Sequence, residues 1–201
     1  MRKVSLLLSA LLLLSIATLG QSLTQAERER AAKYLQQTND GVIAATKGLS
    51  EAQMKFKPAP DRWSVAETLE HIALAEDFLM QNITEKIMKA PAGPTDRDTA
   101  KLDTIILAAV PDRSQKRQAP GPLVPTGRWT PAETLDHFQK SRAKTMAFLE
   151  STPDLREHAS AENPFQQPMD AYQWLLFISA HSERHTKQIL EVKADPNFPK
   201  Q

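Results

Sequence analysis

The sequence predicts an all-α fold, a four-helix bundle preceded by an N-terminal signal peptide. Three observations support this fold class. Only six of the 201 residues are glycine, and no stretch shows sustained alternation of polar and apolar residues. Clusters of proline divide the chain after residue 20 into long blocks that are rich in helix-forming residues. Four long helices bury their apolar faces by packing side by side, which gives a bundle.

The first twenty residues have the order of a secretory signal peptide. The basic start MRK is followed by an apolar run over residues 4–20, and small residues mark its end. An uncleaved membrane anchor is the alternative, but the run is shorter than the ~20 residues that span a bilayer. We therefore expect residues 1–20 to be removed, residues 21–201 to form one domain, and the protein to be exported to the periplasm or secreted. No membrane association is then expected.

The charge and the cysteine count exclude several classes of function. The chain has 25 lysines and arginines against 24 acidic residues, and two of the basic residues lie in the expected signal peptide. A near-neutral domain without a basic block is not typical of nucleic-acid binding. Because cysteine is absent, the domain has no disulfide, no thiolate nucleophile and no cysteine zinc site. Its stability must come from its own core.

The helical blocks follow in order along the chain, with the core of the domain at about 24–194. The expected long helices are 24–49, 64–90, 130–151 and 169–194, and a weaker apolar piece lies at 102–110. The Asn39-Asp40-Gly41 sequence is a weak point in the first block because glycine and asparagine favour turns. The proline-rich region 91–127 is expected either to cover a site or to mediate pairing.

Two of these helices begin with nearly the same sequence, RWSVAETLEH at 62–71 and RWTPAETLDH at 128–137. Each matches a capping box, in which a Ser or Thr oxygen accepts an amide hydrogen and a glutamate three residues later reaches back. The pairs are Ser64 with Glu67, and Thr130 with Glu133. Pro131 fits the first helical position, and the preceding tryptophans suit a hydrophobic staple. A shared start signal explains most of the likeness without a shared function.

The last block contains the most informative pattern. One helical stripe, spaced by four and three residues in alternation, is apolar at both ends and carries two histidines in its middle. The stripe consists of Trp174, Ile178, His181, His185, Gln188 and Val192. Two imidazoles one turn apart can bind a single metal ion. The alternative is that both rings form hydrogen bonds with water or side chains near the end of the bundle, and HxxxH alone does not decide between the two.

The other histidines are less clearly placed. His71 lies on a flank of the second long helix, beside its main apolar stripe, and either faces solvent or faces a neighbouring helix. His137 and His158 are expected to be exposed. No general base stands out, because Glu67 is explained by capping and Glu183 falls on the side of its helix opposite His181. Two further charged residues, Glu70 and Arg184, are expected to be solvated.

Three separated pieces of the chain together resemble the DinB-like (DinB/YfiT) superfamily. They are RWSVAETLEHI, TPAETLDHFQKSRAKTMAFLE and QWLLFISAHSERHTKQILEV, in that order. The family pattern is a Trp-Ser helix start that leads to a histidine, followed by a last long helix ending in HxxxHxxQI. The matching positions here are Trp63, Ser64, His71, His181, His185, Gln188 and Ile189. The resemblance covers nearly the whole chain after residue 20.

The resemblance implies an up-down-down-up bundle that binds a divalent metal ion through His71, His181 and His185, with an open coordination position. Zinc or nickel is the foremost candidate for such ligands. The implied activity is that of a metal-dependent hydrolase or a thiol-dependent transferase acting on an unknown small molecule. A non-catalytic bundle that binds a metal or small ligand is the alternative, and a purely structural protein is the third. A homodimer is also compatible with the resemblance.

Overall fold

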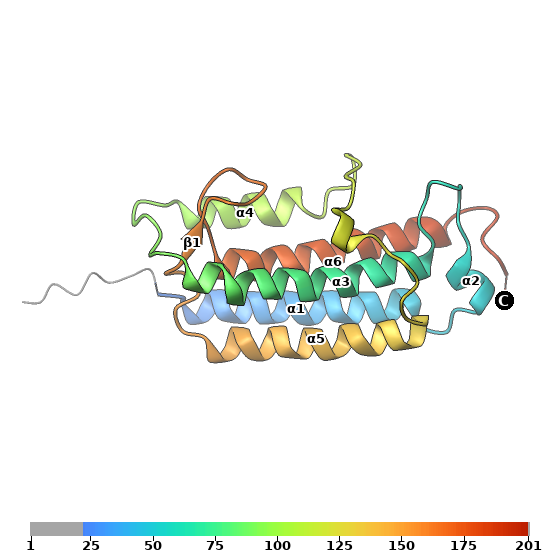
Figure 1. The fold of residues 1–201 in the computed structure, drawn as a ribbon, viewed down its shortest axis with the longest axis horizontal. Coiled ribbons are helices and arrows are strands. Elements are labelled where there is room, and N and C mark those ends of the chain that lie inside the picture. Colours follow the sequence, from blue (N-terminus) through green and yellow to red (C-terminus); the bar gives the residue numbers. More distant parts are fainter. Residues whose placement is uncertain (1–21, 201) are drawn as a thin grey trace, which may run out of the picture.

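The four predicted long helices form a bundle. A computed structural model describes residues 22–200, and the expected signal peptide at residues 1–20 lies outside them. The long helices are α1 (Gln25–Thr46), α3 (Val65–Glu85), α5 (Pro131–Ser151) and α6 (Ala171–Lys193). Figure 1 shows that α1 and α6 run in one direction and that α3 and α5 run in the other. This is the up-down-down-up order.

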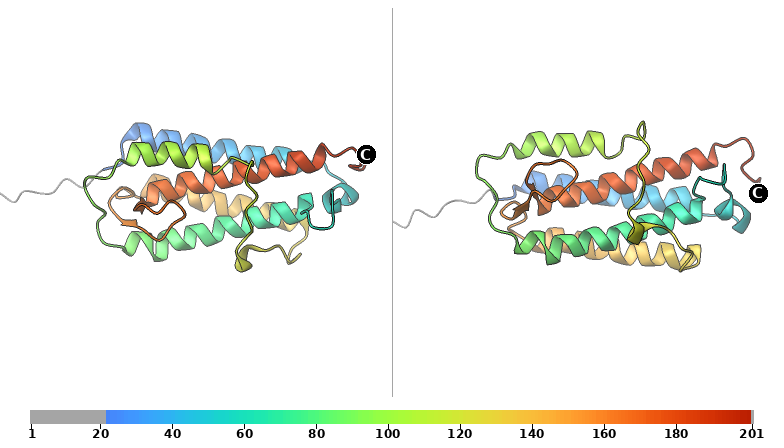
Figure 2. Two further views of the ribbon diagram at one scale, coloured as in Figure 1. Left: turned by 90° about the horizontal axis from the view of Figure 1, so that it is seen from above. Right: turned by 45° about the horizontal axis from the view of Figure 1, so that its top comes forward.

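Shorter helices and two short strands lie along one side and at both ends of the bundle. They are α2 (Glu51–Lys55), η1 (Ile87–Lys89), α4 (Thr99–Ala109), η2 (Gly121–Leu123), β1 (Ala159–Ser160) and β2 (Met169–Asp170). The two strands pair in antiparallel fashion. Helix α4 packs on α6 outside the bundle, and the chain then crosses α6 to reach the side of α3 (Figure 2). The weaker apolar piece expected at 102–110 falls within α4 and its C-terminal cap, whereas α2 and the two short strands were not expected.

The helix starts confirm both predicted capping boxes. Ser64 and Thr130 each accept from the amide of the glutamate three residues later, and each glutamate side chain accepts from the backbone of the cap. The expectation that the helix is weak at Gly41 is wrong, because α1 continues through this residue without a break. Helix α6 covers this position, where an added Cβ would lie 3.7 Å from the Thr186 methyl carbon. Packing against α6 therefore outweighs the local preference for a turn.

The interior of the bundle combines an apolar core with buried charges. Two clusters of aliphatic and aromatic side chains fill the space between the helices. Among them, Arg142 of α5 forms a fully buried ion pair with Glu76 of α3. Where α6 begins, at one end of the bundle, Arg156 pairs with the buried carboxylates of Asp103 and Asp170. Among the described residues, no helix is long and apolar enough to cross a membrane.

Candidate metal centre

Three histidines converge between α3 and α6. The Nε2 atoms of His71 and His181 are 3.2 Å apart, and the ring of His185 lies 4.4 Å from each of the other two rings, centre to centre. Each residue offers a nitrogen within 4.8 Å of the others. His71 is 3% exposed and His185 is 8% exposed. The flank position of His71 therefore faces the neighbouring helix α6.

Hydrogen bonds to the Nδ1 atoms fix the tautomers of two of these rings. His71 Nδ1 donates to the carbonyl oxygen of Leu123 at 2.8 Å, and His185 Nδ1 donates to Gln188 Oε1 at 2.9 Å. An oxygen acceptor requires the proton to be on Nδ1. In a neutral ring, Nε2 then carries the lone pair that a metal ion needs. This is the second-sphere arrangement found around metal-binding histidines in general.

The donor set fits a divalent transition metal. Nitrogens at ~2.05 Å from a tetrahedral zinc ion are about 3.3 Å apart, close to the 3.2 Å between His71 and His181. Three imidazoles without a carboxylate suit zinc, nickel, copper or iron better than magnesium or calcium. The short contact between the two rings also fits a metal-free state, in which Nε2–H of His181 donates a hydrogen bond to Nε2 of His71. That alternative satisfies two of the rings and leaves His185 Nε2 with an unused lone pair.

All three rings are held in the neutral form. Burial lowers the pKa of His71, although its hydrogen bond to Leu123 acts in the opposite direction. Burial, followed by the neighbouring rings, lowers the pKa of both His181 and His185 well below 6.5. Neutral imidazoles are the form that binds a metal ion, so protons do not compete for the site at neutral pH.

These lowered pKa values predict a pH-dependent stability for the metal-free protein. Below about pH 6.5, histidines of the unfolded chain become protonated while those of the folded protein stay neutral. The free energy of unfolding therefore decreases as the pH decreases. We expect a loss of up to about 1.4 kcal/mol per pH unit for each histidine between pH 6.5 and the folded pKa. Urea unfolding of chelator-treated protein at pH 5.2 and 7.2 measures this. A His181→Asn variant should have a shallower dependence, and equal stability at both pH values would contradict the expectation.

Aromatic side chains lie against two of the three rings, those of His71 and His181. The indole of Trp63, just before the cap of α3, lies 4.9 Å from the His71 ring, centre to centre. The ring of Phe177, one turn before His181 on α6, is nearly parallel to it at 6.2 Å. Because apolar groups replace water around the imidazoles, the neutral forms are favoured further.

Residues 110–128, here called the strap, cross the site and are tied to α6 at their beginning. The guanidinium of Arg184 donates to the carbonyl oxygens of Val110, Asp112 and Gln115. The sequence-based expectation that Arg184 is a solvated charge is therefore wrong, since the residue is only 6% exposed. Its partners are backbone oxygens of a distant segment, which helical periodicity does not reveal.

The end of the strap is tied to α3 by Glu70. This carboxylate accepts hydrogen bonds from the amides of Thr126, Gly127 and Arg128 at 3.1, 2.8 and 3.4 Å. Gly127 has a φ of 70°, a conformation that glycine adopts without strain and that lets successive amides point to one anion. Glu70 is 3% exposed, so its interpretation as a solvated charge is also wrong. It holds the segment that supplies the carbonyl partner of His71.

A third connection joins the strap to His185. Arg113 donates to Gln188 Oε1 at 3.2 Å, the same atom that accepts from His185 Nδ1. Both oxygens of Glu191 in turn accept from the Arg113 guanidinium at 2.5 and 2.7 Å. Sequence reasoning placed Gln188 on the histidine stripe but gave it no role, and it missed Arg113. The region 91–127 thus contributes to the site through its last part.

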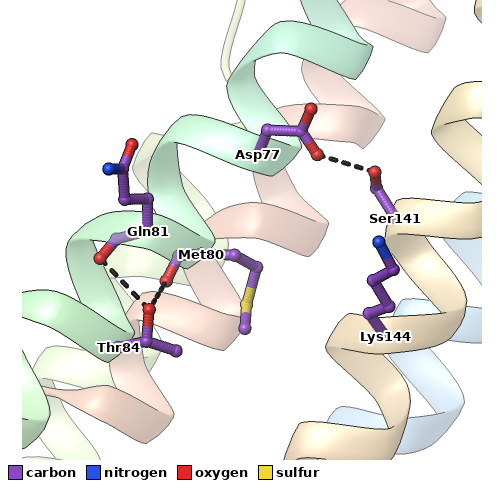
Figure 3. A pocket seen from close by; sticks show the side chains of 6 residues that line it. All are labelled: Asp77, Met80, Gln81, Thr84, Ser141 and Lys144. Atoms are coloured by element: carbon purple, nitrogen blue, oxygen red, sulfur yellow. Dashed lines mark hydrogen bonds between the residues drawn. The ribbon is translucent and has the colours of Figure 1, made fainter.

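The histidine in the second copy of the repeated motif, His137, lies away from the three converging histidines. His137 Nε2 lies 2.6 Å from the Asp77 carboxylate, and the ring stacks on Trp129 at 4.5 Å. His137 is therefore partly buried rather than exposed. Asp77 also accepts from Ser141, beside a groove of about 230 Å³ between α3 and α5 (Figure 3). None of the three converging histidines lines this groove. Both copies bring a tryptophan onto a histidine, but only the first contributes to the site.

His158 is partly buried as well, since its Nδ1 lies 2.6 Å from the carbonyl oxygen of Ala90. It is close to Asp154 and Glu157, and these three could also offer ligand atoms to an ion. Exposed acidic groups of this kind are common without an ion. The group of three histidines, of which His71 and His185 are buried, is the stronger candidate for a metal centre.

Comparisons with known proteins show the family and the fold of the chain. The family model described as DinB superfamily matches residues 34–189, a range that includes the three histidines. The uncharacterized protein YuaE of Bacillus subtilis (strain 168) is 26% identical over 148 residues, which cover 73% of this chain and 87% of YuaE. The solved structure of YfiT from Bacillus subtilis aligns with a TM-score of 0.56 at 14% identity, covering 89% of this chain and 93% of YfiT. That structure is described as a probable metal-dependent hydrolase with an unusual four-helix bundle topology.

Proposed function

This chain belongs to the DinB superfamily, and on that premise we propose that it is a metal-dependent hydrolase with a divalent ion held by His71, His181 and His185. The observation that supports the proposal most strongly is the convergence of three neutral imidazole nitrogens between α3 and α6. The similarity in fold to YfiT, described as a probable metal-dependent hydrolase, points in the same direction.

At such a site, some residues of the chain would bind the ion, others would orient the metal-binding rings, and others would exclude water. The three histidines would bind the ion, and Leu123 and Gln188 would orient the rings of His71 and His185. An ion with three protein ligands and an open position supplies a water of lowered pKa and polarises a substrate oxygen. Phe177 and Trp63 would limit the access of bulk water to the rings. Zinc and nickel are our first candidates for the ion.

Hydrolysis is preferred over thiol transfer because of the proposed location. The basic and apolar N-terminal residues support export, and we propose that the protein acts in the periplasm or outside the cell. Low-molecular-weight thiols are kept in the cytoplasm, so an exported enzyme would lack that co-substrate. Water is available in every compartment.

Metal content and turnover together test the proposal. The protein should be purified without chelators or a histidine tag, and we expect about one equivalent of metal by elemental analysis. Hydrolysis of a panel of esters and amides should stop with a chelator and return when zinc or nickel is added. No metal after loading with either ion would refute the site. Metal without turnover across the panel would instead indicate the non-catalytic metal-binding alternative.

A further inference from the structure

The positive charge of Arg184 has no carboxylate partner in the described part of the chain. Its three hydrogen bonds go to neutral carbonyl oxygens of the strap, and it forms no ion pair with another described residue. The residue directly precedes His185 and is 6% exposed. All the hydrogen bonds of this buried charge go to neutral dipoles, and the carboxylates of Asp112 and Glu191 offset it only in part, so a positive potential remains around it. The three histidines lie in this potential.

Further arginines surround Arg184. Arg113 donates to Gln188 of α6, and Arg117 follows two residues after Gln115, whose carbonyl oxygen accepts from Arg184. Burial lowers the pKa of the Arg184 guanidinium, and the positive charges of Arg113 and Arg117 lower it further. Glu191 neutralises Arg113 through two short hydrogen bonds. Arg117, by contrast, is exposed and has neither a hydrogen bond nor an ion pair with any residue from 22 to 200. The strap therefore presents an unneutralised cation near the site.

The metal-binding side chains supply no negative charge either. Three neutral imidazoles would leave a divalent ion its full charge, and Glu70, the buried carboxylate next to His71, is directed to the amides of the strap. The carboxylates of Asp112 and Glu191 offset the charge of Arg184 in part. Asp112 is exposed and accepts from Ser114, and Glu191 is shared with Arg113 and Arg62. With an ion bound, the site would therefore be strongly cationic.

We infer that the substrate of this site is a small oxyanion, a carboxylate or a phosphate monoester, whose charge is met by the region of Arg184 and Arg117. The inference rests on the proposed function, because it concerns the ligand of the same site. A neutral substrate would leave the charge of the ion uncompensated and that of Arg184 only partly offset. An anionic substrate would supply that charge and would also be steered to the site from solution.

Equilibrium binding to the zinc-loaded protein tests this inference without any assay of turnover. The probes are benzoate and phenyl phosphate, with benzamide as the neutral compound of the same ring size, in isothermal titration calorimetry at low ionic strength. Arg117→Glu reverses the exposed charge of the strap without removing a hydrogen bond. Lys86→Glu makes the same charge change at the far end of α3, fifteen residues or about 22 Å from His71.

We expect at least one of the two anions to bind about tenfold more tightly than benzamide. Arg117→Glu should weaken that binding about fivefold, and Lys86→Glu should weaken it less than twofold, with benzamide unaffected in both. Added salt should reduce the Arg117 effect. Zinc-loaded protein that binds neither anion better than benzamide, or whose Arg117→Glu and Lys86→Glu variants respond alike, would overturn the inference and leave the metal site intact. Protein that binds no zinc would overturn the proposed function and this inference with it.

Discussion

Replacing His181 by alanine is expected to abolish stoichiometric metal binding. His181 lies close to both other rings, 3.2 Å from His71 between the Nε2 atoms and 4.4 Å from His185 between ring centres. Structural zinc sites with four ligands provide about 10–16 kcal/mol, which is about 2.5–4 kcal/mol per ligand. The loss of one ligand should therefore weaken binding by about a hundredfold to a thousandfold. Competition with a chromogenic chelator measures the affinity of both proteins.

The matched control for this substitution is His137→Ala. It removes the histidine at the corresponding place in the second copy of the repeated motif, which pairs with Asp77 away from the site. Metal content and affinity should remain as in the unaltered protein. The two variants should also differ in a thermal assay, because zinc should raise the melting temperature of His137→Ala but not that of His181→Ala. A stoichiometric ion in His181→Ala, at unchanged affinity, would exclude His181 as a ligand.

The long helices were predictable because their signals are local. Capping boxes and prolines act within a few residues of a helix end, so the starts at Ser64 and Thr130 follow from the sequence. The continuity of α1 through Gly41 was not predictable, since it depends on α6 packing across it. The five-residue helix α2 and the two-residue strands are too short to produce a recognisable period.

The candidate site was predictable only in part, for a related reason. The stripe that carries His181 and His185 is a property of one helix, whereas the role of His71 depends on how α3 and α6 are rotated toward each other. The residues alone left that open, and the family resemblance supplied the third histidine. Glu70 and Arg184 were missed because their partners are backbone groups of the strap, more than fifty residues away. No periodic pattern marks a charge that binds a distant loop.

Replacing Arg142 by methionine is expected to cause the largest loss of stability. Arg142 is 1% exposed and donates to both oxygens of Glu76 at 2.8 Å. It also donates to the Leu35 carbonyl oxygen and the Ser182 hydroxyl, so it connects α5 with the three other long helices. Its removal leaves the Glu76 carboxylate buried without a cation. We expect the free energy of unfolding to fall by about 3–5 kcal/mol, measured by urea unfolding.

Two further variants separate the ion pair from the space that it fills. Lys140→Met removes an exposed charge from the same helix and should change stability by less than about 0.5 kcal/mol. The double variant with Arg142→Met and Glu76→Leu removes both charges and should recover most of the loss, because no unpaired charge remains. A single variant that loses less than about 1 kcal/mol, or a double variant no more stable than the single one, would contradict this account.

Ser182, a partner of Arg142, directly follows His181. If the ion pair also sets the register of α6, the double variant should be stable and yet bind the metal ion more weakly.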